Sequence, residues 1–479
     1  MQRSIAPLFL LAALAAPAAH GTQLIAIGRL QGSSVGANAD LSGLGGALEN
    51  GAAGNLLGGL GSGFAWAGGN TFLATPDRGP NAVSYNSLVD NTSSYIARFQ
   101  TISFQLTANA PASALPYALT PTLVATTLLS SPTTLSYGSG ALGTDATHTL
   151  GSGVPALNAI DRTNYFTGRS DGFAAGGSTN PNNARLDPES IRVANDGKSV
   201  FIADEYGPYV YQFDRATGQR LRSFQMPHEL AVAKPGPTTS SEGASANSTG
   251  RVANKGMEGL AITPDGKTLV GIIQAPLLQD NHNVVRIVTI DIATGITKQD
   301  AYQLTTGSRV SEITAVNDHV FLVDERDGKG LGDGTAAAVK KLYRIDLDDA
   351  SGKEITGKSG DLSAFAVPKT EFLDIRATLV GAGVGVTNAL VPAKIEGVAF
   401  GDDIVMNGTS FHKLWITNDN DFVADVAGPN QFFVYAVSDA DLGTTFQAQA
   451  IAPVPEPESW ALLLCGLGLS GWIARRRRI

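Results

Sequence analysis

Short apolar runs that alternate with polar residues, separated by turn signals, recur along most of the chain. The clearest case is residues 187–214, where the runs 191–193, 200–202 and 210–213 predict three β-strands. The turn Asn195-Asp196-Gly197 separates the first two runs, and such Asx-Gly turns between alternating apolar runs are a strong hairpin signal. The pattern therefore predicts an antiparallel meander.

The same order of elements occurs four times: an acidic residue, a strand, a turn, a strand with a polar or acidic end, and a third strand. Each copy begins with a glutamate, and these are Glu189, Glu258, Glu312 and Glu396. Radial repetition of short antiparallel strands is typical of a β-propeller. We therefore predict an all-β chain that forms a single propeller of four-stranded antiparallel blades, with six blades favoured and seven possible.

The propeller is expected to occupy residues 22–450. A hairpin predicted within residues 64–74 belongs to the first blade, and residues 96–126 are expected to supply strands of the next one. The strand predicted at residues 23–30 is expected to pair with the last blade and so close the ring.

Both ends of the chain carry targeting patterns. Residues 1–21 have one arginine, an apolar run and small residues, which together indicate a secretory signal peptide. Residues 451–479 contain Pro455-Glu456-Pro457, a short apolar stretch and four arginines, and this order resembles the PEP-CTERM sorting signal. That resemblance implies export in a Gram-negative bacterium, a membrane-anchored form before processing by an exosortase-type enzyme, and a final place at the cell surface or outside the cell. A permanent single-pass anchor is the alternative.

Charge and cysteine content narrow the range of partners. The formal net charge is −9, which argues against binding to nucleic acid or to anionic membrane surfaces. The one cysteine, Cys465, lies in the C-terminal segment, so the body of the protein has no disulfide. Membrane contact is expected to be transient and to involve only the C-terminal apolar segment.

The repeat places carboxylates at one end of the ring, because the start of a first strand and the end of a second strand lie at the same edge of a meander. Their mutual repulsion requires a cation, a basic partner or a proton. Oxygen ligands in this number suit Ca²⁺, whereas the six histidines and single cysteine do not suggest zinc. The expected ligands are Glu189, Asp204, Glu205, Glu258, Glu312, Asp324, Glu325, Glu396 and Asp419. Alternatively, the glutamates accept hydrogen bonds from backbone amides of neighbouring blades.

Candidate catalytic residues lie among these carboxylates and the arginines beside them. Glu258 and Glu396 are the expected acid–base groups, and Arg78 and Arg326 are expected to hold a phosphate or carboxylate. Arg192 is a further candidate for this role. Simple ion pairing with acidic neighbours is the alternative for all three arginines.

A family resemblance rests on seven short motifs distributed over roughly residues 55–437. They are Asp77-Arg78-Gly79-Pro80-Asn81, Asp187-Pro188-Glu189-Ser190, Asp204-Glu205-Tyr206-Gly207-Pro208, Glu258-Gly259-Leu260-Ala261, Asp324-Glu325-Arg326, Glu396-Gly397 and Asn418-Asp419-Asn420-Asp421-Phe422. As a set they resemble the phytase-like domain family described as having esterase-like activity. The resemblance implies a propeller and suggests hydrolysis of a small phosphoester or carboxyl ester.

Three functions remain open from the sequence. The first is an exported, Ca²⁺-dependent esterase or phosphoesterase. The second is a non-catalytic propeller that binds extracellular polysaccharide or protein. The third is a lactonase-type propeller with a central Ca²⁺.

Overall fold

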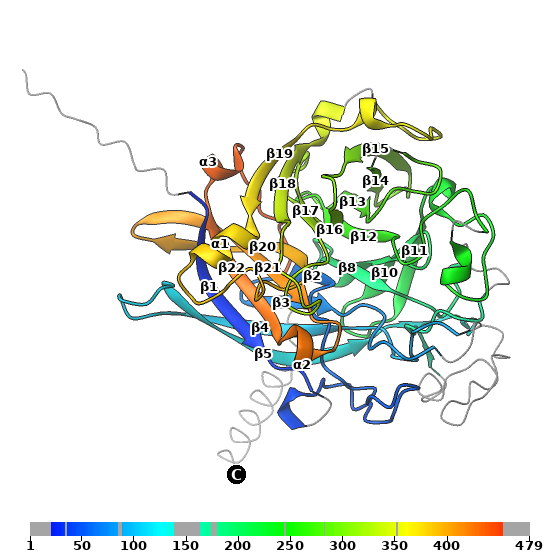
Figure 1. Cartoon of the computed structure of the whole chain (residues 1–479), viewed down its shortest axis with the longest axis horizontal. Helices are drawn as coiled ribbons and strands as arrows, with labels where there is room; N and C mark the ends of the chain where they lie inside the picture. Colours follow the sequence, from blue (N-terminus) through cyan, green and yellow to red (C-terminus); the bar gives the residue numbers. More distant parts are fainter. Residues whose placement is uncertain are drawn as a thin grey trace, which may run out of the picture.

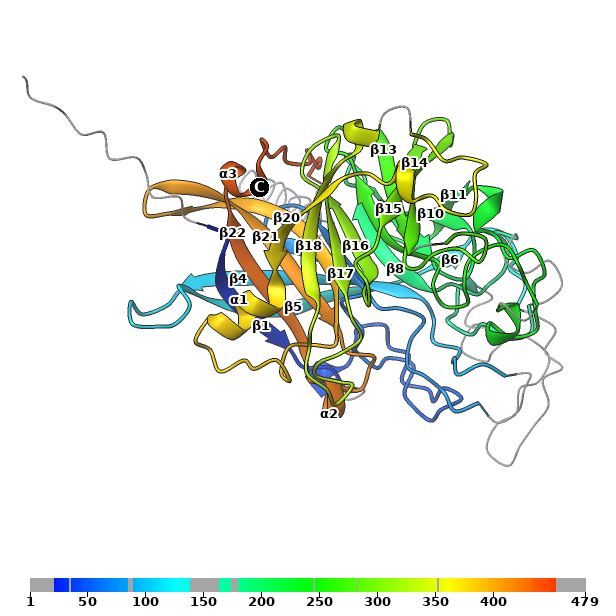
Figure 2. The same ribbon diagram turned by 45° about the horizontal axis from the view of Figure 1, so that its top comes forward.

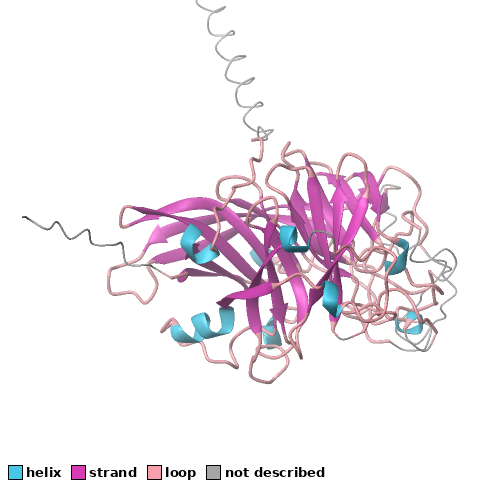
Figure 3. Cartoon of the chain, turned by 90° about the horizontal axis from the view of Figure 1, so that it is seen from above, coloured by secondary structure: helices cyan, strands magenta, loops and turns pink. Residues whose placement is uncertain are grey.

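The computed structural model describes residues 21–33, 36–84, 89–137, 163–173, 180–243, 246–281, 283–350 and 353–453. Nearly all of the predicted signal peptide, and the sorting motif Pro455-Glu456-Pro457, lie outside the described residues. Strands dominate the described part, and the helices are short (Figure 3). None of the helices described is long and apolar enough to cross a membrane.

Five four-stranded antiparallel sheets form the body, and each is built from strands close together in sequence. The first contains β2 (Gly63–Trp66), β3 (Thr71–Thr75), β4 (Arg98–Ala108) and β5 (Tyr117–Leu128). The second contains β8 (Pro188–Val193), β9 (Ser199–Asp204), β10 (Tyr209–Asp214) and β11 (Arg220–Gln225). The third contains β12 (Met257–Ile262), β13 (Thr268–Ile273), β14 (Val284–Asp291) and β15 (Thr297–Gln303).

The remaining two sheets complete the body. The fourth contains β16 (Arg309–Ala315), β17 (Val320–Arg326), β18 (Lys340–Asp346) and β19 (Lys369–Asp374). The fifth contains β20 (Lys394–Met406), β21 (Thr409–Asp419), β22 (Asn430–Val437) and β1 (Gln23–Leu30). A small two-stranded sheet of β6 (Ser130–Ser131) and β7 (Asn164–Tyr165) lies outside these five.

The first strands of the five sheets line the centre of a ring. They contact one another in the closed order β2, β8, β12, β16, β20 and back to β2, as Figure 1 shows. The burial of their residues agrees with a position at the centre of the ring. Every residue of β8 and β12 is buried, whereas the outer strand β11 has only two buried residues. The predicted all-β propeller is therefore confirmed.

The expected sixth blade is not found among the described residues. The sequence predicts that residues 96–126 supply strands of a new blade, but β4 and β5 pair onto β3 as the third and fourth strands of the first sheet. Both are unusually long, and their hairpin extends beyond the body of the ring (Figure 2). A long hairpin and a separate pair of inner strands have the same alternating pattern, so the sequence alone did not distinguish them.

The predicted closure of the ring is confirmed. β1 pairs antiparallel with β22 along its whole length and forms the outermost strand of the last sheet. The N-terminal strand thus completes a sheet whose other strands come from the C-terminal part of the body.

The turns between first and second strands use the predicted chemistry. Gly197 and Gly266 follow an aspartate in these turns and have φ values of 69° and 73°, a region that strongly favours glycine. The adjoining strands therefore reverse direction within a few residues.

Candidate active site at the mouth of the propeller

Backbone bulges at the start of the inner strands position three of the predicted glutamates. The pairing of β8, β12 and β20 with the second strand of each sheet is interrupted at Glu189, Glu258 and Glu396, respectively. A bulge re-aims a side chain and is common next to active sites. All three glutamates are buried and lie at the end of the ring where the inner strands begin, which is called the mouth below.

In the fourth blade the glutamate is displaced by one residue. The interruption of β16 lies between Val310 and Glu312, so Ser311 occupies the position that glutamate has in the other blades. Since successive residues of a strand point to opposite sides, a shift of one residue re-aims the side chain. Glu312 therefore does not join the carboxylates at the mouth.

Glu312 instead pairs with Arg192 in the centre of the ring. Oε2 of Glu312 lies 2.9 Å from Nη2 of Arg192, and its Oε1 accepts a hydrogen bond from the backbone amide of Leu260. Of the two interpretations of Arg192 left open by the sequence, the structure favours ion pairing with a carboxylate over contact with a substrate.

Glu205 completes a compact group of carboxylates at the mouth. It follows β9 directly, and one oxygen each of Glu189, Glu205 and Glu258 lies within 4.8 Å of the others. Oε1 of Glu205 accepts a hydrogen bond of 3.2 Å from the amide of Gly256.

Two further groups adjoin the first. Asp77, Asp187 and Glu189 meet the same 4.8 Å criterion, as do Asp77, Asp419 and Asp421. Because Glu189 and Asp77 each belong to two groups, the carboxylates form one continuous cluster. The sequence prediction missed Asp77, Asp187 and Asp421 as members. Asp77 was recognisable, because it follows the second strand of its blade as Glu205 does.

Basic side chains neutralise part of this cluster. Arg78 lies 3.2 Å from Asp187, and Arg326 contacts Glu396 and lies 3.9 Å from Glu258. On the other side, Nζ of Lys394 lies 2.8 Å from Asp419 and 2.5 Å from Asp421. No such ion pair is found for Glu189 or Glu205 among the described residues.

Burial and mutual repulsion alter the protonation of the cluster. Burial and the neighbouring Glu258 carboxylate raise the pKa of Glu189 well above its ordinary value. Burial and the nearby Glu205 do the same to the pKa of Glu258. The pKa of Glu205 rises to about 8, through burial and the adjacent Asp187. Without a cation, the group therefore holds protons at neutral pH.

The cluster, and Glu396 beside it, also have buried oxygens with no hydrogen-bond partner. Within the described part of the chain, Oε2 of Glu205, of Glu258 and of Glu396 has no such partner. A buried charged oxygen without a partner is costly. Carboxylate oxygens that converge in this way suit a hard cation such as Ca²⁺, which binds six to eight oxygens.

Besides Glu312 and Glu396, three other predicted ligands lie outside these groups. Asp204 caps the turn that follows it, accepting hydrogen bonds from the amides of Tyr206 and Gly207. Glu325 contacts Lys369 and accepts a hydrogen bond of 2.6 Å from the hydroxyl of Tyr302. Asp324 is fully buried, and neither of its oxygens has a hydrogen-bond partner among the described residues.

A polar pocket of about 310 Å³ adjoins the cluster at Arg78. Nη1 of Arg78 is held by Asp187 and Asn254, so this residue lies between the carboxylates and the pocket. Most of the side chains that line the pocket carry a hydroxyl, an amide or a charge. The lining residues are Arg78, Asp90, Asn91, Thr92, Ser170, Tyr206, Thr239, Ser240, Ala253 and Asn254.

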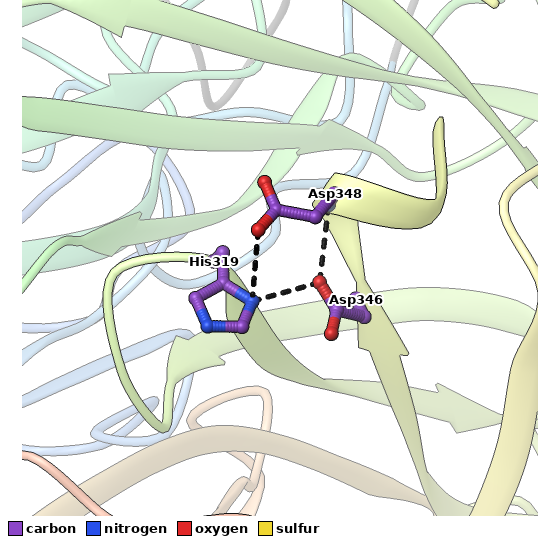
Figure 4. Close-up of side chains that lie close together, drawn as sticks. All are labelled: His319, Asp346 and Asp348. Carbon is purple, nitrogen blue, oxygen red and sulfur yellow. Dashed lines mark hydrogen bonds and ion pairs between the residues drawn. The ribbon is translucent and has the colours of Figure 1, made fainter. Parts of the chain in front are cut away.

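A separate acidic group lies on the surface at the opposite end of the ring. Nδ1 of His319 lies 2.8 Å from Asp346 and 3.6 Å from Asp348 (Figure 4). The hydrogen bond with Asp346 raises the pKa of His319. All three residues are at least partly exposed, and the group is unconnected with the mouth.

Comparison with known proteins identifies the family. The family model described as "Esterase-like activity of phytase" matches residues 55–422. The chain belongs to this family. The PEP-CTERM protein-sorting motif matches residues 453–478, so this phytase-like protein is exported from the cytoplasm of a Gram-negative bacterium and carries a signal for exosortase-type processing. The predicted localisation is confirmed.

Individual relatives of this phytase-like chain are distant. An "Uncharacterized secreted protein" of Arthroderma benhamiae is 28% identical over 352 residues, which cover 64% of this chain and 63% of the relative. The chain thus spans less than two thirds of that relative's length.

Among solved structures, a PQQ-bound aldose sugar dehydrogenase from Streptomyces coelicolor is 13% identical with a TM-score of 0.31, over 80% of this chain and 96% of that one. A putative 6-phosphogluconolactonase from Bacteroides uniformis is 12% identical with a TM-score of 0.28, over 77% and 82% of the two chains.

Proposed function

We propose that this protein hydrolyses a small hydrophilic ester or phosphoester outside the cytoplasm, with Ca²⁺ held by the carboxylates at the mouth. One observation carries the proposal: Glu189, Glu205 and Glu258 converge within 4.8 Å, and two of them present a buried oxygen that has no hydrogen-bond partner among the described residues. Structural carboxylates are normally satisfied by hydrogen bonds or ion pairs, so the arrangement supports ligation of a cation.

The roles proposed for individual residues follow from their surroundings. When bound, Ca²⁺ would neutralise the carboxylates and polarise the ester or phosphoryl oxygen. Glu189, Glu205 and Glu258 would hold the ion, and Glu396 would accept the proton of the attacking water through its Oε2, which has no hydrogen-bond partner among the described residues. Arg326 holds the Glu396 side chain in place, since the two side chains form an ion pair. Arg78 contacts a negatively charged oxygen of the substrate.

The pocket beside Arg78 supports a hydrophilic substrate. Most of its described lining residues have hydroxyl, amide or charged side chains, and Ala253 is the aliphatic residue among them. Burial in an apolar pocket is the main source of affinity for lipid-like esters, so such esters are expected to be poor substrates. The same lining suits a sugar, and a non-catalytic carbohydrate-binding propeller is the second candidate function.

The test is hydrolysis by the full-length protein of p-nitrophenyl phosphate, p-nitrophenyl acetate and a sugar lactone. Each assay follows treatment with EDTA, with and without added Ca²⁺, and is repeated for the Glu258→Gln/Glu396→Gln variant. We expect turnover that Ca²⁺ restores and that the folded variant lacks. If none of the three substrates is turned over while the protein binds an oligosaccharide in calorimetry, the carbohydrate-binding function replaces this proposal. Turnover of the lactone alone would instead identify a lactonase.

A further inference from the structure

The end of the described chain lies across the face of the ring opposite the mouth. After β22 and the short helix α3 (Asp439–Leu442), residues 444–452 form an extended segment, called the strap below. It runs over the points where the inner strands finish and enter their turns, which is called the bottom face. In Figure 2, α3 and α2 (Ala424–Ala427) lie at opposite ends of the sheets. Helix α3 precedes the strap, whereas α2 follows Asp421 at the mouth.

Specific hydrogen bonds hold the strap to two blades. Asn317, in the turn after β16, donates to the hydroxyl of Thr444 and to the carbonyl of Thr445, and the amide of Gln447 donates to the carbonyl of Val316. On the far side of the ring, Nε2 of Gln449 donates to the carbonyl of Val193 at 2.7 Å.

The second blade also binds the last described residues. Nε2 of Gln449 lies 2.7 Å from Oδ1 of Asn195, and the amide of Ala452 donates to the backbone carbonyl of Asn195 at 2.8 Å. The fifth sheet contributes Phe400 of β20, whose ring centroid lies 4.5 Å from that of Phe446 in the strap. The strap therefore crosses the ring and is attached at both ends.

The strap encloses the bottom of the channel. A cavity of about 50 Å³ lies between Arg192 in the centre of the ring and the strap residues 446–449. Among the described residues, Arg192, Glu312 and the strap lie between the bottom face and the carboxylates at the mouth.

The length of chain beyond the strap restricts how the body can lie on a membrane. The sorting motif begins at residue 453, directly after Ala452. The apolar stretch begins at Trp460, eight positions after Ala452. Eight residues span at most ~28 Å when fully extended. If the mouth faced the membrane, this linker would have to run around the outside of a blade. Crossing the four strands of a sheet takes roughly 14 Å, and following the strands to the mouth takes roughly 20 Å more. The available chain is too short for that path.

We propose that the strap fixes the orientation of the membrane-tethered precursor, with the bottom face against the lipid surface and the carboxylate mouth directed away from it. The segment that carries the sorting motif then leaves the body at the membrane side. The mouth stays open to solutes outside the cell before processing as well as after it. This inference concerns the tether and holds whether the mouth catalyses a reaction or only binds a ligand.

Two exposed lysines provide matched reporter positions for a test. Lys198 lies in the turn after β8 on the bottom face, and Lys329 follows β17 at the mouth. In full-length protein with Cys465→Ser, each is changed to cysteine and labelled with the same fluorophore. The labelled proteins are inserted into phosphatidylcholine vesicles that carry a nitroxide quencher at the headgroup, which acts over a short range.

We expect loss of fluorescence for the Lys198→Cys protein and none for the Lys329→Cys protein. Equal quenching at both positions, or stronger quenching at Lys329→Cys, would overturn the proposal. A third protein contains a long Gly/Ser insertion between Pro453 and Val454, which should abolish the difference by freeing the body. If the difference persists there, an affinity of the bottom face for lipid sets the orientation, and the proposed role of the strap is wrong.

Discussion

Arg192 and Glu312 form a buried ion pair, 2.9 Å long, that joins the inner strands of the five four-stranded sheets. The guanidinium of Arg192 donates to backbone carbonyls of β2, β8, β16 and β20, at Phe64, Ile191, Ile313 and Val398. Glu312 reaches the remaining strand, β12, by accepting from the amide of Leu260. The centre of the propeller is thus closed by two side chains that hold the ring together.

Replacement of one partner should destabilise the whole ring. In Arg192→Met the carboxylate of Glu312 stays buried without its cation, and four carbonyls lose a donor. Breaking a buried pair in this way costs about 3–5 kcal/mol, so the midpoint of urea unfolding should fall markedly. The control is Arg376→Met, because the pair of Arg376 with Asp374 is partly exposed and such pairs contribute about 0–1 kcal/mol. Equal midpoints for the two variants would mean that the central pair does not hold the blades together.

Removal of two carboxylates from the mouth should abolish the response to Ca²⁺. A ligand that binds only the folded state raises its stability, by about 2.7 kcal/mol at a concentration 100 times its dissociation constant. We expect Ca²⁺ to raise the melting temperature of the natural protein but not that of Glu189→Gln/Glu258→Gln. Glu325→Gln is the matched control, because Glu325 is also buried and acidic but lies outside the carboxylate groups. Loss of the response in Glu325→Gln, with retention in the double variant, would place the ion elsewhere.

The stability of the cation-free protein should fall as the pH rises. Burial raises the pKa of Glu205 from an ordinary value of 4.5 to about 8, so between these values the folded state binds more protons than the unfolded state. This contribution to stability is complete below the unfolded pKa and is lost as the pH approaches the folded pKa. Urea unfolding in EDTA at about pH 5 and about pH 9 measures the difference.

Two additions make this pH experiment decisive. Ca²⁺ should reduce the loss of stability at high pH, because it replaces the protons on the carboxylates. The Glu205→Gln variant should show a smaller dependence on pH than the natural protein. An unchanged pH dependence in that variant would show that other groups cause it.

Replacement of Arg78 should discriminate between anionic and neutral substrates. Hydrogen bonds to charged groups contribute about 1.5–3 kcal/mol, so Arg78→Gln should lower kcat/KM for p-nitrophenyl phosphate by about 10- to 100-fold. Hydrolysis of p-nitrophenyl acetate, which has no charged oxygen, should change much less. Equal losses for both substrates would indicate that Arg78 acts only by holding Asp187 in place.

Much of the fold was determined by patterns that are local in sequence. The alternation of apolar and polar residues and the turns at Gly197 and Gly266 define hairpins, because side-chain direction in a strand and φ at a glycine depend on adjacent residues. The glutamates at the start of the blades also follow from this repeat. The export signals are linear motifs, and the sequence alone predicted them.

The tertiary structure decided which of these residues meet. Ser311, not Glu312, takes the place of glutamate in the fourth blade, because the bulge at the start of β16 falls on Ser311 and Glu312 is the next residue along the strand. The strands β4 and β5 join the first sheet and not a new one, and this depends on which edge they pair with. Asp77 and Asp187, and likewise the strap and Asn195, are far apart in sequence, and only the packing of neighbouring sheets and of the strap against the ring brings them together. Contacts of this kind leave no local pattern in the sequence, because their geometry depends on how whole sheets pack around a common axis.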